Sequence, residues 1–90
     1  MAEGMMGAWS EYHKLSPEDQ KVFDEGMEGF TGVGYSPVAV ATQVVNGENY
    51  SFFCNATLVS VGEEHFPAMV DMYKKPSEKA EITKINQLEY

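Results

Sequence analysis

The dipeptide Asn46-Gly47, set between two stretches of strand-like composition, constrains the fold of this chain more than any other feature. Asparagine and glycine both tolerate positive φ, which the tightest hairpin turns require. The preceding stretch, 35–45, is uncharged, rich in β-branched and small residues, and without helical periodicity. The following stretch, 50–61, has an apolar face made of Tyr50, Phe52, Cys54, Ala56 and Leu58. The sequence therefore predicts an antiparallel hairpin of two long strands.

An amphipathic helix is predicted before this hairpin. Ser16 is a suitable N-cap and Pro17 suits the first helical position. Apolar residues then recur at three- and four-residue spacing, namely Val22, Phe23, Met27 and Phe30. Glycines from Gly29 onward end the pattern, which predicts a helix of roughly three to four turns. Gly26 inside it costs about 1 kcal/mol relative to alanine unless a neighbour packs closely against it.

The remainder of the chain is predicted to continue as an antiparallel meander. A turn at 62–64 leads to a third strand, 66–73, with Phe66, Ala68, Val70 and Met72 facing inward. Pro67 predicts an irregular or edge start, because proline cannot donate to the ladder. A polar turn, 74–79, follows. The three-residue spacing of the apolar positions in 82–90 favours a helix, but the segment is short and weakly capped, so we expect a strand.

These elements predict an α+β fold, with one amphipathic helix packed on an antiparallel sheet of four to five strands. Ninety residues suffice for one modest core, so the whole range 1–90 is expected to form a single domain.

The charge balance argues against two classes of partner. Six lysines oppose fourteen acidic residues, which gives a formal net charge of −8. This field repels nucleic acid and anionic lipid, so we expect neither nucleic-acid binding nor membrane binding. The stretch 29–47 carries no charge, but it is too polar to span a bilayer. One cysteine and no positively charged, apolar leader in 1–8 favour a cytoplasmic location.

We expect no enzymatic activity, no metal site and no cofactor. Cys54 with His13 or His65 supplies the residue types of a thiol nucleophile and its base. However, Cys54 lies among inward apolar residues, where a free cysteine usually acts as a small hydrophobe. The two histidines are far apart in sequence and lack neighbours at zinc-ligand spacing. The acidic residues lack the spacing of a calcium loop.

Trp9, the single tryptophan, has two interpretations. It anchors a first strand against the helix or sheet by burying apolar area, or it is an exposed contact of the N-terminal segment. We favour anchoring, because a lone tryptophan in a small domain more often belongs to the core.

The pentapeptide Gln43-Val44-Val45-Asn46-Gly47 matches the Gln-x-Val-x-Gly pattern of the first hairpin loop in the cystatin superfamily. The preceding helix and Tyr50 soon after the glycine are similar to the stefin branch, whose members are cytoplasmic and lack disulfides. The resemblance covers about 4–90. The absence of tryptophan in the second loop is shared with stefins, whereas the short helix and the bulky Asn46 depart from the pattern.

This resemblance implies a reversible, non-covalent inhibitor of papain-like cysteine proteases. An N-terminal trunk, here 1–9 and flexible, would enter the active-site cleft together with two hairpin loops. Gly7 corresponds to the trunk glycine, with Gly4 as the alternative, and Lys75 and Pro76 correspond to the second loop.

Within the first loop, each residue of the pattern has an expected role. Val44 and Val45 alternate faces, so one of them would meet the protease, and Gln43 could hold the base of the loop by hydrogen bonding. Gly47 would let the backbone approach closely. Substituting Gly47 by Glu or Val45 by Asp is expected to abolish inhibition and spare the fold.

Two alternatives stay open at this point. The chain could be a cystatin-fold interaction module with no inhibitory activity, since fold does not fix function. It could also self-associate as a dimer that exchanges its first hairpin.

Overall fold

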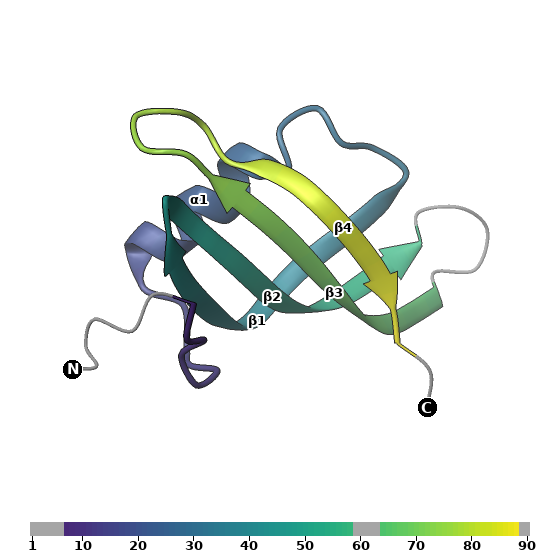
Figure 1. Cartoon of the computed structure of the whole chain (residues 1–90). Coiled ribbons are helices and arrows are strands. Elements are labelled where there is room, and N and C mark those ends of the chain that lie inside the picture. Colours follow the sequence, from purple (N-terminus) through teal and green to yellow (C-terminus); the bar gives the residue numbers. More distant parts are fainter. Residues whose placement is uncertain (1–6, 59–63, 89–90) are drawn as a thin grey trace.

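The computed structural model describes residues 7–58 and 64–88. One helix packs against a four-stranded antiparallel sheet of order β1-β2-β3-β4, which confirms the α+β class and is consistent with a cystatin-like fold (Figure 1). The elements are α1 (Pro17–Gly26), β1 (Val33–Val45), β2 (Gly47–Leu58), β3 (Glu64–Lys74) and β4 (Glu81–Gln87). Within the described residues, no helix is long and apolar enough to cross a membrane. The predicted trunk residues 1–6 with Gly4, the turn at 62–63 and the chain end at 89–90 lie outside the described residues.

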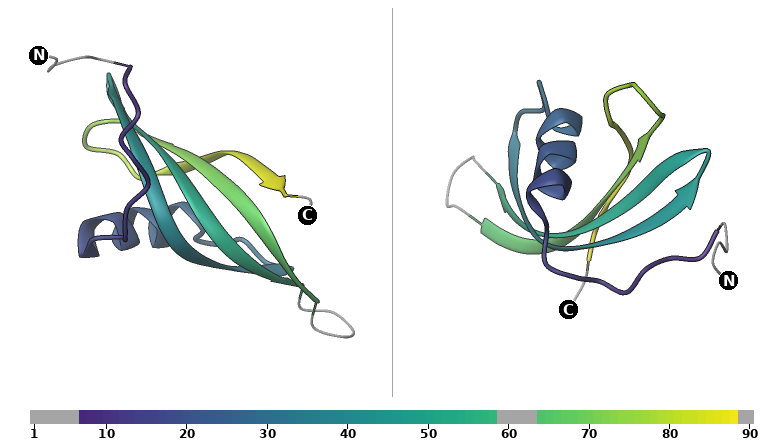
Figure 2. Two further views of the ribbon diagram at one scale, coloured as in Figure 1. Left: turned by 90° about the horizontal axis from the view of Figure 1, so that it is seen from below. Right: turned by 90° about the vertical axis from the view of Figure 1, so that its left-hand side faces the viewer.

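The predicted hairpin is confirmed, and its turn is as tight as the Asn-Gly pair indicates. Val45 pairs with Gly47, so that Asn46 alone connects β1 to β2, and Gly47 has a φ of 107°. β1 begins two residues earlier than predicted and β2 three residues earlier, because the pairing runs right up to the turn. The sheet curves around α1, which lies on its concave side (Figure 2).

The helix begins as predicted and ends earlier than predicted. Ser16 and Asp19 form a capping box, in which the Asp19 amide donates to Ser16 Oγ at 3.1 Å and the Ser16 amide donates to Asp19 Oδ2 at 3.0 Å. The helix stops at Gly26, so the prediction that Phe30 belongs to its apolar stripe is wrong. Phe30 is 41% exposed and packs against Tyr35 with ring centroids 5.8 Å apart. Met27 caps the helix because the glycines that follow favour other conformations.

The core lies between α1 and the inner face of the sheet. Phe52 is fully buried at its centre, where the Phe23 ring meets it edge-on at 4.9 Å and the Tyr50 ring stacks on it at 5.7 Å. The inward sets predicted for the second and third strands are confirmed, with Phe66 and Leu58 only partly buried. Gly26 does have a closely packed neighbour, since a Cβ at this position would overlap the Met72 side chain. This contact favours glycine at Gly26, the last residue of the helix.

The C-terminal segment is a strand, as predicted. Its apolar residues are spaced by three because the pairing of β3 with β4 shifts between Asp71 and Met72, leaving Thr83 as an extra residue. This irregularity turns both Ile82 and Ile85 toward the core. β3 begins at Glu64, two residues earlier than predicted, so Pro67 lies within the strand and not at its start. Pro67 pairs with Asn55 of β2 and comes just before the part of β3 that pairs with β4.

Candidate functional site

Three segments that are distant in sequence meet at one end of the sheet. The β1–β2 turn and the β3–β4 turn lie at this end, and the N-terminal segment runs beside β1 (Figure 1). The Gly7 amide donates to the Val44 carbonyl at 3.2 Å, and the Tyr73 hydroxyl donates to the Asn46 carbonyl. We call this region the hairpin end, defined by Gly7, 43–47 and 73–76. It brings together every described residue for which the sequence predicted a binding role.

Gln43 joins the N-terminal segment to the first hairpin. Its Nε2 donates to the Gly7 carbonyl at 2.8 Å, and its Oε1 accepts from Asn49 Nδ2 at 2.8 Å. Gln43 therefore spans the trunk, β1 and β2 with one amide group, which confirms the predicted hydrogen bonding at the base of the loop. Because both ends of the amide are used, the side chain is held in one orientation.

Further bonds align the N-terminal segment with β1. The Ser10 amide donates to the Thr42 carbonyl at 2.8 Å, and the Thr42 amide donates to Ser10 Oγ at 2.9 Å. Isolated bridges join Trp9 to Gln43 and His13 to Val40. The segment thus follows the edge of β1 without becoming a fifth regular strand.

The two valines of the loop alternate as predicted, and the structure shows which one faces solvent. Val44 is 58% exposed, whereas Val45 is half-buried. Asn46 is exposed at the tip, and its carbonyl is occupied by Tyr73. Val44 is therefore the apolar side chain of this loop that a partner protein can reach most fully.

Gly47 is required by the molecule itself, so the expectation that Gly47→Glu spares the fold is wrong. Its φ of 107° lies in a region that L side chains rarely adopt, and a Cβ there would be 2.5 Å from the Lys74 carbonyl oxygen. The close backbone approach predicted for this glycine is made to β3. A side chain at this position would push the two turns apart.

Lys75 and Pro76 are exposed in the β3–β4 turn, next to Gly47. A groove of about 380 Å³ separates this turn from the first turn of α1, with Glu18 on the helical side. Tyr50 lines the groove and donates its hydroxyl to Glu48 Oε1 at 3.2 Å. Burial, followed by the neighbouring Glu48 carboxylate, raises the pKa of Tyr50 above its ordinary value. The phenol therefore stays a neutral donor.

Gly7 is exposed, has a φ of 92°, and has no atom within 4 Å of the position its Cβ would take. Its backbone is bonded to β1 through both its amide and its carbonyl. Gly7 is therefore placed at the hairpin end, whereas Gly4 lies outside the described residues.

Trp9 lies against the sheet but is not buried in the core, so the prediction that it anchors a first strand as a core residue is wrong. Its side chain is 49% exposed and lies on the face of the sheet away from α1, over Ala41 and Ser51. The physical reason is the path of the N-terminal segment. It runs along the edge of β1, and α1 covers the other face of the sheet, so Trp9 is left on the uncovered face (Figure 2).

Two residues that support the hairpin end were not predicted from the sequence. The pairing of Asn49 with Gln43 could have been found, because both lie three positions from Asn46 and therefore face each other in a hairpin centred there. The bond from Tyr73 to Asn46 depends on the register of β3, and no local pattern fixes it.

The groups considered for catalysis or metal binding lie apart from this site. Cys54 is 0% exposed, and burial raises the pKa of its thiol to about 12, so it remains protonated at neutral pH. His13 contacts the Lys14 carbonyl, and His65 contacts the Thr57 hydroxyl. Across 7–58 and 64–88, no three histidine, cysteine, aspartate or glutamate side chains are grouped as metal ligands would be.

Comparison with known proteins gives no match to any family model, to any curated protein or to any solved structure.

Proposed function

We propose that this chain is a reversible, non-covalent inhibitor of papain-like cysteine proteases, similar to the cytoplasmic stefins. The observation that carries the proposal is the pair of hydrogen bonds through which Gln43 joins Gly7 to the first hairpin. They hold the trunk glycine and the Gln-x-Val-x-Gly loop together, as simultaneous entry into one cleft requires. The β3–β4 turn with Lys75 and Pro76 lies next to Gly47 and would form the third contact.

The proposed mode of action depends on a surface formed before binding. The loop is fixed by Gln43, by the Tyr73 bond to Asn46 and by the close packing of Gly47 on Lys74. A preformed loop loses little conformational freedom when it binds, which favours tight association. Val44 would supply apolar area at the centre of the contact, and the exposed backbone at Gly7 would follow the narrow cleft.

The same rigidity would oppose cleavage. A protease must distort a bound backbone toward its transition state, and this loop is held from both sides by hydrogen bonds. We therefore expect occlusion of the protease nucleophile without reaction. The inhibitor would be recovered intact.

The test is a titration of papain with the purified chain, following hydrolysis of a fluorogenic peptide. We expect inhibition that Val44→Asp weakens about 30-fold or more, since a buried carboxylate at the centre of an interface costs at least about 2 kcal/mol. Val38→Asp is the matched control, because Val38 is 50% exposed on β1 and lies at the bulge away from the turn. It should inhibit like the parent chain.

Deletion of 1–7 supplies an independent variant, which removes the partner of Gln43. Weaker inhibition is expected, with a cooperative unfolding transition retained. Absence of inhibition by the folded parent chain at micromolar concentration would refute the proposal. The alternative would then be an interaction module that uses the same end of the sheet without blocking a protease.

Exchange of the first hairpin between two copies also stays a prediction. The one-residue turn at Asn46 would open into a continuous strand in such a dimer. Size-exclusion chromatography with light scattering distinguishes the monomer from the dimer.

A further inference from the structure

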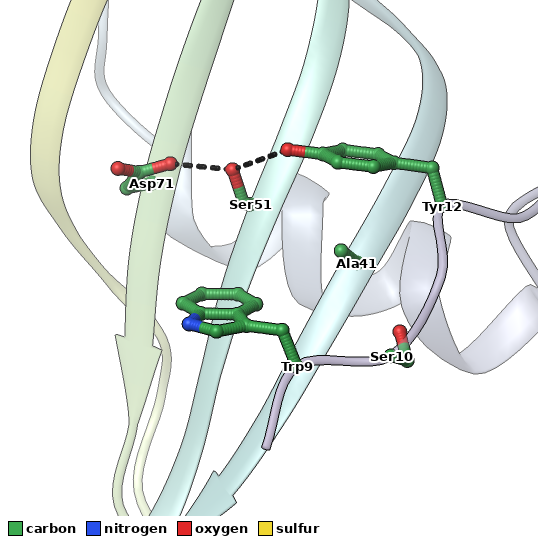
Figure 3. A pocket seen from close by; sticks show the side chains of 6 residues that line it. All are labelled: Trp9, Ser10, Tyr12, Ala41, Ser51 and Asp71. Atoms are coloured by element: carbon green, nitrogen blue, oxygen red, sulfur yellow. Dashed lines mark hydrogen bonds between the residues drawn. The ribbon is translucent and has the colours of Figure 1, made fainter. Parts of the chain in front are cut away.

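A small pocket lies on the face of the sheet away from α1, outside the hairpin end. Trp9 and Tyr12 reach over β1 from the N-terminal segment, and their rings are separated by the space above Ala41 and Ser51 (Figure 3). The side chains of Trp9 and Tyr12 are 49% and 53% exposed. Ala41, which has only a methyl group as its side chain, lies on the floor of the pocket and takes up little of its space.

A hydrogen-bonded chain forms the polar side of this pocket. Ser51 Oγ donates to Asp71 Oδ1 at 2.8 Å, and since this uses its only proton, the Tyr12 hydroxyl donates to Ser51 at 3.1 Å. These hydrogen bonds hold the Tyr12 ring against the sheet. They also direct the negative end of the network, the Asp71 carboxylate, to the rim of the pocket (Figure 3).

The pocket is electrostatically suited to a cation. Both ring faces carry the negative side of an aromatic quadrupole, and Asp71 adds a formal negative charge at the same place. Within the described ranges, no cationic side chain forms an ion pair with Asp71, although Lys84 lies opposite it on β4. The chain as a whole carries a net charge of −8, which attracts a positively charged partner.

We propose that Trp9, Tyr12 and Asp71 bind an arginine side chain of a partner polypeptide. The pocket has a volume of about 170 Å³, smaller than the roughly 300–1,000 Å³ that holds a drug-sized ligand, so its size fits a single side chain. A guanidinium group is planar and weakly hydrated, stacks on aromatic faces, and donates charge-assisted hydrogen bonds to a carboxylate. Those properties match two ring faces with one carboxylate beside them.

The proposed arginine site can be tested without a protease. Trp9 is the only tryptophan, so its fluorescence reports directly on the pocket. The probe is the peptide acetyl-Gly-Arg-Gly-amide, and its control replaces arginine by citrulline, which has the same shape and no charge. A lysine peptide tests for a preference between the two cations.

We expect a saturable change in Trp9 emission with the arginine peptide, at least tenfold weaker binding of the citrulline peptide, and weaker binding of the lysine peptide. Equal binding of the arginine and citrulline peptides would overturn the proposal, since the pocket would then select apolar area alone. No saturable change up to roughly 20 mM arginine peptide, well above the millimolar range of weak specific binding, would also overturn it.

Variants that keep Trp9 test the individual contributions. Asp71→Asn keeps the shape and removes the charge, and Tyr12→Leu removes one ring face. Each should weaken binding of the arginine peptide about tenfold. Phe53→Leu is the matched control, because Phe53 is 36% exposed on the same face and does not line the pocket. Circular dichroism would establish that each variant is folded. Unchanged binding of the arginine peptide by folded Asp71→Asn would contradict the role assigned to the Asp71 carboxylate.

Discussion

Replacing Gly47 by alanine separates two requirements that coincide at the turn between β1 and β2. One is the φ of 107°, and the other is the position of the Lys74 carbonyl oxygen, 2.5 Å from the site of the added Cβ. Gly32→Ala is a natural control, because Gly32 has a φ of 99° and no atom within 4 Å of its Cβ position. Both variants therefore strain the backbone, and only Gly47→Ala also collides with β3.

The expected magnitudes follow from these two terms. A side chain at positive φ costs about 1–2 kcal/mol, which applies to both variants. Real Cβ contacts are essentially never shorter than 3.0 Å, so Gly47→Ala must also move the backbone of β3 by about half an ångström. Overpacking of this kind costs a further 1–3 kcal/mol or so. Gly47→Ala should therefore be less stable than Gly32→Ala by about 1–3 kcal/mol.

Urea unfolding at equilibrium measures both free energies, and thermal unfolding gives a second reading. The extra destabilisation corresponds to a Tm lower by about 4–8 °C for each kcal/mol in a domain of this size. If Gly47→Ala and Gly32→Ala are equally stable, the first turn does not pack closely on β3, and this contact does not hold the hairpin end in place before binding.

Two further perturbations probe the core and the helix. Burial raises the pKa of Cys54 to about 12, so the thiol ionises first in the unfolded chain, and the parent protein should lose stability as the pH rises from about 9 toward 12. Urea unfolding at pH 8 and pH 10 measures this effect. Between these pH values the parent should lose about 1 kcal/mol more unfolding free energy than Cys54→Ala, because the contribution of Tyr50 is common to both proteins. An equal loss in the two proteins would contradict the effect assigned to the Cys54 thiol. Ser16→Ala removes the bond to the Asp19 amide and should lower the free energy of unfolding by about 1 kcal/mol, whereas the exposed Ser36→Ala should leave it nearly unchanged. Equal unfolding curves for these two serine variants would show that the capping box contributes nothing.

Local sequence patterns predicted the positions where a single residue type settles the backbone. Ser16 with Pro17 marked the start of the helix, and Asn46-Gly47 marked the turn, because caps and tight turns depend on a few adjacent residues. The alternation along 50–58 likewise identified the buried face of β2, since successive side chains of a strand point to opposite faces.

Patterns failed where a distant segment decided the outcome. Phe30 continued the helical spacing, yet the chain had already left the helix at Gly26 and Phe30 packs on Tyr35. The spacing of Ile82 and Ile85 resembled a helix because the irregular pairing with β3 inserts one residue between them. In both cases the apolar residues were identified correctly, and their geometry depended on partners elsewhere in the chain.

The sequence by itself determined the fold class, the hairpin and the residues of the first loop, because backbone preferences and the alternation of side chains act over a few residues. Only the tertiary structure decided how the loop is arranged and held. It exposed Val44 in place of Val45, joined Gln43 to Gly7, packed Gly47 on Lys74 and left Trp9 on the outer face. These contacts depend on the register and curvature of the sheet, which bring together residues that lie tens of positions apart, and short-range patterns carry no information about such distances.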